Sequence, residues 1–398
     1  MPGNGPACLH LLQYSRPACS GAGVFSVVFM TDSISLASGY GSFLTPGVAA
    51  EAAIRSIRAG QLPVADAAGL PVLREAIARR YQQLEATHVE PQHVVVTPGA
   101  KAALSALLTC VLRPGDEVLL PTPNWFGFGE LVSRAGGVVR ELPLSPDDNY
   151  TLHPEQLRAA ISPHTRVLLF SNPNNPTGRV YHHEELASLL AVTRDFPELY
   201  VLSDEIYDLV SFATKPTPSL LEFPDPHGQH LVVNGFSKSL ALIGWGVGYL
   251  VAPTAVAARC AAYRHATGGA ASVPAQYAAL AVTQSAASVA SGLVSQLHTG
   301  RNLLLDYLQR LPGVLPFLPE ATYYAFPDLR AYLTPGMPVA DAARELVTHL
   351  RQAGVEVVDG TTCGAPGFVR LSYAVPEPLL REALNRLAIA LRQHAAAR

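Results

Sequence analysis

Three segments of the chain each end an apolar run and then present polar side chains that can bind a ligand. FSNPNNPTG carries Asn175, VLSDEIYD carries Asp204 and Tyr207, and VVNGFSKSLALIGWGVGY carries Lys238. In a parallel sheet the carboxyl ends of the strands open on one crevice, where α/β proteins bind their ligands. We therefore expect an amide, a carboxylate, a phenol and an amine to meet in one site.

Taken singly, each of these residues has an ordinary structural explanation. Asn175 is typical of a turn, Asp204 of a helix N-cap, Tyr207 of the edge of a core and Lys238 of a solvated surface. Their joint occurrence at three strand ends favours a shared site.

The elements that would place these strand ends are predicted from the spacing of apolar residues. Helices are expected at 73–84, 100–112, 154–161 and 184–193, and strands at 93–97, 117–121, 138–142, 166–170, 199–203 and 231–235. Strands that alternate with helices pair in parallel, with helices on both faces of the sheet. The expected fold class is α/β, with a mostly parallel sheet between helices in a large domain.

The pattern changes after about residue 254. A long Ala-rich helical region is followed by strands in TYYAFPDL, VEVVD and FVRLSYA, which alternate with helices in DAARELVTHLRQA and LLREALNRLAIALRQ. This pattern predicts a smaller α+β domain. We expect residues 61–285 to form the large domain, and residues 30–60 with 286–398 to form the small one.

Composition narrows the classes of partner. The 398 residues predict two domains, and 49% apolar residues can bury a large core. A net charge of -3 offers no basic field for nucleic acid, and no apolar stretch is long enough to span a bilayer. Five scattered cysteines indicate neither a disulfide framework nor a metal site, which fits a cytoplasmic protein.

Residues 1–29 are rich in Gly, Pro, Cys and Ser, and Arg16 is their only charged residue. A signal peptide would carry early positive charge and a longer apolar core, so export is not expected. We expect either that translation starts at Met30 or that the segment is a disordered extension. The intact mass of the natively expressed protein distinguishes the two.

The motifs together resemble a known family. NPNNPTG, SDEIY, SK followed by GWGVGY, and FVRLSYA occur in the order and at the intervals of the class I/II pyridoxal-phosphate (PLP)-dependent aminotransferases of fold type I, from about Ile34 onward. The resemblance implies an aspartate-aminotransferase-like fold, PLP as cofactor, and ping-pong transfer of an amino group from an L-amino acid to a 2-oxo acid. It also implies a homodimer with active sites at its interface.

The resemblance assigns the catalytic roles residue by residue. Lys238 would form the Schiff base with PLP and later move the substrate Cα proton. Asp204 would pair with the pyridine nitrogen, and Asn175 and Tyr207 would bind the phenolic oxygen. Trp125 would lie against the cofactor ring.

The remaining assignments concern the phosphate and the substrate. Free N–H groups at the start of the helix in TPGAKAAL suit a phosphate. By resemblance Gly99, Ala100, Lys101 and Ser237 would hold the cofactor phosphate. Arg370 would clamp the substrate α-carboxylate, with Gly39, Trp125 and Asn175 also contacting the substrate.

Three positions depart from the family pattern. Gly246 replaces an arginine, Val64 replaces a tyrosine that reaches the partner's phosphate, and Gly235 stands where serine is frequent. Each lost charged hydrogen bond is worth roughly 1.5–3 kcal/mol, so cofactor affinity falls unless Lys101, Ser237 or another loop compensates. We still expect PLP to bind.

Alternatives stay open at this point. Related PLP enzymes eliminate, decarboxylate, cyclise or oxidise amino acids with the same cofactor residues, and a non-catalytic PLP-binding protein would share them too. A dehydrogenase is disfavoured because no GxGxxG follows the first strand. The segment ATGGAASVP offers no obvious arginine for a substrate side-chain carboxylate, although nearby Arg264 keeps a dicarboxylate substrate open.

Overall fold

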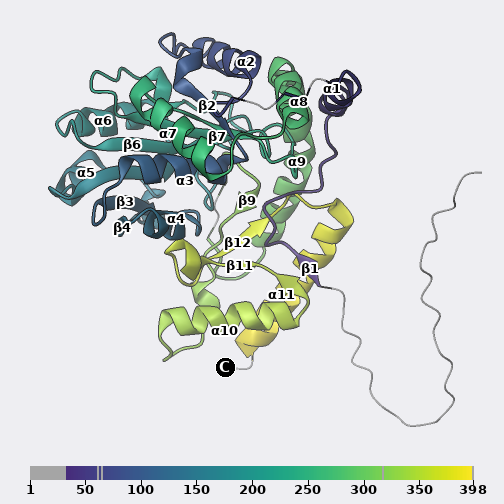
Figure 1. Ribbon diagram of the computed structural model, residues 1–398. Helices are drawn as coiled ribbons and strands as arrows, with labels where there is room; N and C mark the ends of the chain where they lie inside the picture. The colour runs from purple at the N-terminus through teal and green to yellow at the C-terminus, as the bar shows by residue number, and fades with distance from the viewer. Residues whose placement is uncertain (1–32, 61, 64–65, 316–317, 397–398) are drawn as a thin grey trace, which may run out of the picture. The chain divides into compact units, whose positions relative to one another are not determined.

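The computed structural model describes residues 33–398 except 61, 64–65, 316–317 and 397–398 (Figure 1). Segment 1–29, Met30 and Val64 lie outside the described residues. The expectations for these positions stay predictions.

The largest sheet has seven strands in the order β2-β8-β7-β6-β5-β3-β4. The strands are β2 (Val94–Thr97), β3 (Glu117–Thr122), β4 (Val138–Pro143), β5 (Thr165–Ser171), β6 (Tyr200–Asp204), β7 (His230–Gly235) and β8 (Gly248–Val251). Only β8 is antiparallel to its neighbours. The expected mostly parallel sheet is therefore confirmed.

Strand β8, which begins at the end of GWGVGY, was not expected from the sequence. No helix separates β7 from β8, so the chain cannot cross over to run parallel and instead returns antiparallel beside β7. Its segment GYLV follows the glycines of GWGVG, which obscure a strand pattern.

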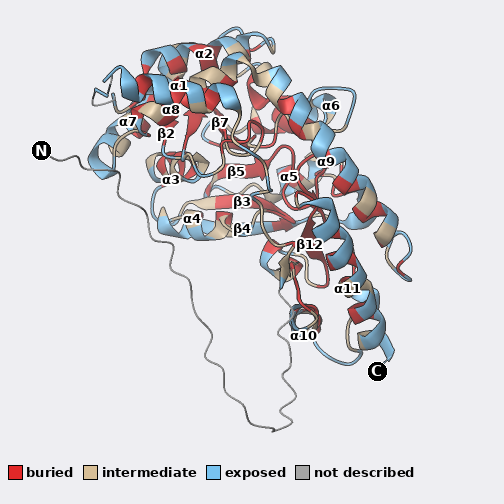
Figure 2. Ribbon diagram, turned by 90° about the vertical axis from the view of Figure 1, so that its right-hand side faces the viewer, coloured by how far each residue is buried: buried red, intermediate tan, exposed pale blue. Residues whose placement is uncertain are grey.

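Successive side chains of each central strand enter two different cores. On β6, Val201 packs in one core and Leu202 in the other, as the two-residue period of a strand requires. The first core is covered by α2 (Pro71–Gln82), α5 (Pro154–Ala160), α6 (His183–Thr193) and α8 (Val273–Gln284), and the second by α3 (Ala100–Val111), α4 (Phe128–Arg134) and α7 (Thr254–Thr267). Figure 2 shows these strands buried between helices.

A third core surrounds the shorter strands of the C-terminal part. Its elements are α9 (Ala286–Leu308), β9 (Tyr324–Ala325), α10 (Val339–Gln352), β10 (Val355–Glu356), β11 (Val358–Asp359), β12 (Val369–Ser372) and α11 (Glu377–Ala396). Short 3-10 turns lie at Pro91–His93, Pro146–Asp148, Leu220–Glu222, Arg330–Tyr332 and Gly360–Cys363.

The single strand expected in VEVVD is wrong: the structure has two. β10 pairs with β1 (Ile34–Ser35), whereas β11 joins β12 and β9 in an antiparallel sheet. The run changes partners at Val357, which is itself buried.

The division into a large and a small domain stays a prediction. Helix α1 (Gly47–Arg58), which belongs to the predicted 30–60 part of the small domain, packs through Ala49 and Ala53 into a core of the seven-stranded sheet.

Among the described helices, none is by itself long and apolar enough to cross a membrane. Helices α8 and α9 meet that test only as a pair, and they are bent by 83° at their junction.

Candidate active site

The carboxyl ends of the three predicted strands lie side by side. β5, β6 and β7 are neighbours, and their pairing sets Ser171 beside Asp204 and Asp204 beside Val233. The loops that carry Asn175, Tyr207 and Lys238 therefore leave the sheet side by side.

The asparagines of NPNNPTG have different tasks. Asn172 donates to the backbone oxygens of Tyr181 and Pro218, and Asn174 accepts from Thr177, so both hold the loop in shape. The Oδ1 of Asn175 instead accepts from Arg370 Nη1 at 3.0 Å. Asn175 thus lies beside the residue predicted to bind the substrate carboxylate.

The Lys238 amine is partly buried and lies close to the N-terminal loop. Its Nζ donates to Gly39 O at 2.6 Å and lies 4.2 Å from the centre of the Tyr40 ring. Burial lowers the pKa of Lys238 to about 8, and the charges of Arg370 and Lys101 act in the same direction. A substantial fraction of the amine is therefore neutral near pH 8, as a nucleophile or proton acceptor needs.

Asp204 is a buried carboxyl group, and few protein groups stabilise its negative charge. Its Oδ1 accepts a 3.3 Å hydrogen bond from Ile206 N–H, and burial raises its pKa to about 7 although the Lys238 charge opposes this. A cationic N–H donor placed here would gain much from the carboxylate.

Arg370 is buried and holds its guanidinium through two groups. Nη1 donates to Asn175 Oδ1 and Nη2 donates to Ala37 O at 2.9 Å, whereas Nε has no partner among the described residues. The guanidinium also stacks on the Tyr324 ring, with 4.2 Å between Cζ and the ring centre. An unpaired buried donor fits a carboxylate ligand.

The start of α3 is open, as the phosphate assignment requires. Gly99 is its N-cap with φ of 88°, and a Cβ built there would meet no atom within 4 Å. Gly248 allows β8 to press against this turn, because a Cβ at Gly248 would lie 2.4 Å from Ala100 N. Lys101 Nζ lies 5.4 Å from the centre of the Trp125 ring.

The departure from the family pattern at Gly246 leaves open space, whereas a Cβ built at Gly235 would contact Gly248, Val247 and Ile206. Gly246 has φ of 63°, and no atom lies within 4 Å of a Cβ built there. Ser237 is partly buried in the turn before Lys238, so its hydroxyl is placed in the same turn as the predicted nucleophile.

Two aromatic residues at the site were missed by the sequence reasoning. Tyr324 hydrogen-bonds Tyr207 and stacks on Arg370, and Tyr40 lies over Lys238. TYYAFPDL predicted only a strand, because nothing local marks a hydroxyl whose partner lies 117 residues away.

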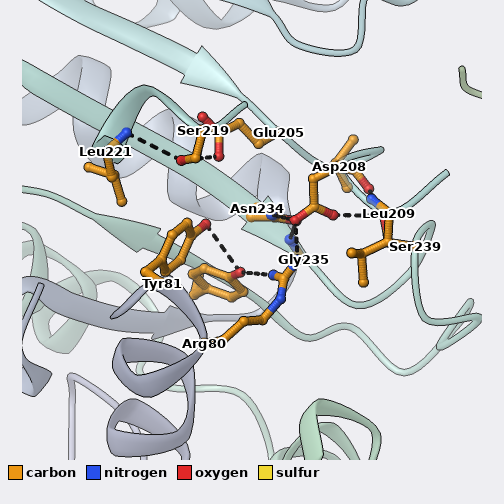
Figure 3. A network of polar contacts seen from close by, with 12 residues as sticks. Arg80, Tyr81, Glu205, Asp208, Leu209, Ser219, Leu221, Asn234, Gly235 and Ser239 are labelled. Atoms are coloured by element: carbon orange, nitrogen blue, oxygen red, sulfur yellow. Dashed lines mark hydrogen bonds and ion pairs between the residues drawn. The ribbon is translucent and has the colours of Figure 1, made fainter. Parts of the chain in front are cut away.

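A second polar cluster, the Arg80–Asp208 network, surrounds the Asp208 carboxylate and includes Ser239 (Figure 3). Asp208 accepts from Arg80, from Asn234 Nδ2 at 2.9 Å and from Ser239 Oγ at 2.9 Å. Ser239 Oγ also accepts from Leu209 N–H at 3.2 Å. Since Ser239 follows Lys238, the network anchors the turn that presents the amine.

The donor set of the candidate site fits PLP. The buried Asp204 carboxylate suits a protonated pyridine nitrogen, the open start of α3 suits a phosphate, and Lys238 suits an aldehyde. The free Nε of Arg370 is left for a substrate carboxylate.

Comparisons with known proteins agree. The family model described as aminotransferase class I and II matches residues 31–387. The chain is 37% identical over 362 residues to the aspartate/prephenate aminotransferase of Thermus thermophilus, covering 90% of each chain. It is 34% identical over 359 residues to the aspartate aminotransferase of Geobacillus stearothermophilus, covering 89% of this chain and 90% of that one.

The fold is shared as well. A solved structure of Thermus thermophilus aspartate aminotransferase with maleate superposes with a TM-score of 0.82 at 36% identity, covering 90% of this chain and 92% of that one. The chain belongs to the class I and II aminotransferases, with their two-part α/β architecture of fold type I. It is a PLP-dependent aminotransferase.

Proposed function

We propose that the enzyme takes the amino group of an acidic L-amino acid and passes it to a 2-oxo acid in a ping-pong reaction. The observation that carries the site chemistry is the positive charge of Arg370 and Lys101, both of which lower the pKa of Lys238, whereas Asp204 is the one carboxyl group among the causes of that shift. These cations favour a substrate with a carboxylate. Because every amino acid carries an α-carboxylate, we infer the acidic donor from the relatives named as aspartate aminotransferases.

The roles of the residues follow from their positions. When bound, PLP supplies an aldehyde that an amine can capture and a ring that withdraws electrons. Lys238 holds the cofactor and, once released, moves the proton at the substrate Cα. Asp204 keeps the pyridine nitrogen protonated by accepting its hydrogen bond. Arg370 binds the α-carboxylate.

Asn175 is oriented for a donor role. Its Oδ1 accepts from Arg370, so its Nδ2 is left to donate to the phenolic oxygen of the cofactor. Tyr207 donates to the same oxygen. The Asn175 side chain would thus connect Arg370, which binds the substrate carboxylate, with the phenolic oxygen of the cofactor.

The phosphate is held by the first turn of α3 and by its neighbours. The backbone N–H groups of Ala100 and Lys101 open the helix, so they have no carbonyl partner within it and favour an anion. Lys101 and Ser237 add a charge and a hydroxyl. These groups replace the arginine absent at Gly246.

We also propose a homodimer. The segment from Tyr40 to Val72 exposes large apolar side chains, including Leu44 at 92% and Ile57 at 54%. On α1, Ile54 and Ile57 are exposed, whereas Ala49 and Ala53 are buried. An apolar surface of this kind marks an interface, and Tyr40 brings it to Lys238. Sedimentation velocity tests the homodimer, and a monomer at micromolar concentration would contradict it.

The cytoplasmic location stays a prediction.

The test of the function is an absorbance titration of the purified protein with PLP, comparing wild type with Lys238→Ala and with Lys215→Ala. Lys215 is exposed and is the matched control. We expect an absorbance band that needs Lys238 but not Lys215, and its conversion to pyridoxamine phosphate by aspartate or glutamate, reversed by a 2-oxo acid.

Three results would contradict parts of the proposal. A band that only neutral amino acids convert would reject the acidic donor. Release of other products without pyridoxamine phosphate would indicate one of the other PLP reactions. Absence of a Lys238-dependent band would reject the assigned site.

A further inference from the structure

Tyr324 lies at the centre of the candidate site and contacts residues that were assigned to different ligands. Its hydroxyl lies 2.8 Å from the Tyr207 hydroxyl, and its ring lies 4.2 Å from Arg370 Cζ. A Cβ built at Gly39 would lie 2.4 Å from its oxygen. The phenol is therefore confined on three sides.

The sheet fixes this position. Tyr324 on β9 is paired with Ser372 on β12, and Arg370 lies two residues before Ser372 on the same strand face. A diagonal cross-strand neighbour of this kind is within reach of a long side chain, which explains why the guanidinium covers the ring. The hydroxyl at the far end of the ring then reaches Tyr207.

The hydrogen bond between the two phenols raises a question of direction. A phenol has one hydrogen to donate. If Tyr207 donated to Tyr324, it would have none left for the phenolic oxygen of PLP. Only donation from Tyr324 to Tyr207 leaves the Tyr207 hydrogen free for the cofactor.

The surroundings favour Tyr324 as the donor. Burial raises the pKa of both phenols, and the Arg370 charge opposes this at both, with the guanidinium stacked directly on the ring of Tyr324. Tyr324 raises the pKa of Tyr207 further. The more acidic phenol is the better donor. The other groups that act on Tyr324 are Tyr40 and Cys363.

We propose that Tyr324 is a positioning residue that donates its hydrogen to Tyr207 and so directs and strengthens the hydrogen bond that Tyr207 gives to the cofactor. This rests on the proposed roles of Tyr207 and Lys238. Linked hydrogen bonds polarise one another, so removal of the first weakens the second. Because the ring also supports Arg370, one side chain connects the cofactor site with the substrate-carboxylate site.

The test is a pH titration of the absorbance of Lys238-bound PLP in wild type, Tyr324→Phe, Tyr207→Phe and the double variant. Phe keeps the ring on Arg370 and removes only the hydroxyl. A weaker hydrogen bond to the phenolic oxygen raises the pKa of the Lys238–PLP linkage. We expect Tyr324→Phe to raise it by roughly half a pH unit, and Tyr207→Phe by more.

The double variant separates a relay from a direct effect. The double variant should match Tyr207→Phe, because Tyr324 acts through Tyr207. An unchanged pKa in Tyr324→Phe, or a full additional shift in the double variant, would overturn the proposal. Equilibrium dialysis should show PLP affinity falling in Tyr324→Phe, as a second readout independent of turnover.

Tyr373→Phe is the matched control. Its hydroxyl donates to Thr322 O at 2.9 Å in the same core, so it loses one buried hydroxyl without touching Tyr207. We expect it to leave the pKa of the linkage unchanged. If Tyr373→Phe shifts that pKa as much as Tyr324→Phe does, the effect is one of packing and the proposal fails.

A wild type without a Lys238-dependent band would reject the proposed function as well, whereas a normal band without pKa shifts in the variants would reject only the role of Tyr324.

Discussion

Two polar clusters adjoin the turn that carries Lys238, and they differ in how completely their groups are paired. In the Arg80–Asp208 network both carboxylate oxygens of Asp208 accept hydrogen bonds from side chains. In the candidate active site Asp204 accepts one long backbone hydrogen bond, and Arg370 keeps an unpaired Nε. A group left unpaired in a buried position is costly unless a ligand completes it.

The pKa shifts of the two clusters differ in direction. In the Arg80–Asp208 network, burial acts to lower the pKa of Arg80 but Asp208 raises it, which keeps the guanidinium charged. In the candidate site burial displaces the pKa of Asp204 upward and that of Lys238 downward, each toward neutrality. Perturbed groups of this kind mark functional sites more often than structural ones. The paired cluster holds the turn, and the unpaired one is left for cofactor and substrate.

The same Asp→Asn substitution is expected to act differently in the two clusters. Asp204→Asn should leave folding intact, because it removes a poorly compensated buried charge, but should lower kcat/KM. The lost charged hydrogen bond to the cofactor, several kcal/mol in a buried setting, corresponds to roughly a hundredfold to a thousandfold. Steady-state kinetics and urea unfolding measure both effects. A stable variant with activity within tenfold of wild type would contradict the role of Asp204.

Asp208→Asn should have the opposite outcome. It leaves the buried Arg80 without a carboxylate, and breaking such a pair destabilises a protein by about 3–5 kcal/mol. The midpoint of urea unfolding should fall, while the folded fraction still forms the Lys238-dependent band. Exposed Asp306 on α9, which pairs with Arg310 just beyond the helix, is the matched control, since Asp306→Asn should change stability by less than about 1 kcal/mol. Equal losses in the two variants would contradict the anchoring role of the network.

The sequence predicted one of these clusters far better than the other. Asn175, Asp204, Tyr207 and Lys238 could be placed together because parallel strands bring their carboxyl ends to one edge. Arg80 could not be paired with Asp208, since 128 residues separate them and the motif ARRYQQ is equally typical of a solvated helix face. Tyr324 was missed for the same reason, because its partner Tyr207 lies 117 residues away, whereas β8 was missed because glycines obscure its strand pattern.

A smaller effect is expected from Gly39→Ala. The added methyl group would collide with the Tyr324 hydroxyl, so the tyrosine must move and strain of about 1–3 kcal/mol is expected, or roughly fivefold to a hundredfold in kcat/KM. Gly47→Ala is the control, because no atom lies within 4 Å of its Cβ position. Combining Gly39→Ala with Tyr324→Phe removes the colliding atom and should recover part of the loss. No recovery would mean that the alanine acts elsewhere, for example on Lys238.

The stability of the cofactor-free protein is expected to depend on pH. The pKa of Asp204 is raised on folding from 3.8 to about 7, so the folded state binds more protons between these values and stability falls as pH rises from about 4 to 7. The pKa of Lys238 is lowered from 10.5 to about 8, so the unfolded state binds more protons in that interval and stability rises from about pH 8 to 10.5. Urea unfolding of wild type, Asp204→Asn and Lys238→Met across this range isolates each contribution. Between pH 4 and 7 the free energy of unfolding of Asp204→Asn should rise relative to that of wild type. Between pH 8 and 10.5 the excess stability of Lys238→Met over wild type should disappear. If the free energy of unfolding had the same pH dependence in all three proteins, the charges of Asp204 and Lys238 would be stabilised by neighbouring groups in the folded state. The contrast between the two clusters would then be wrong.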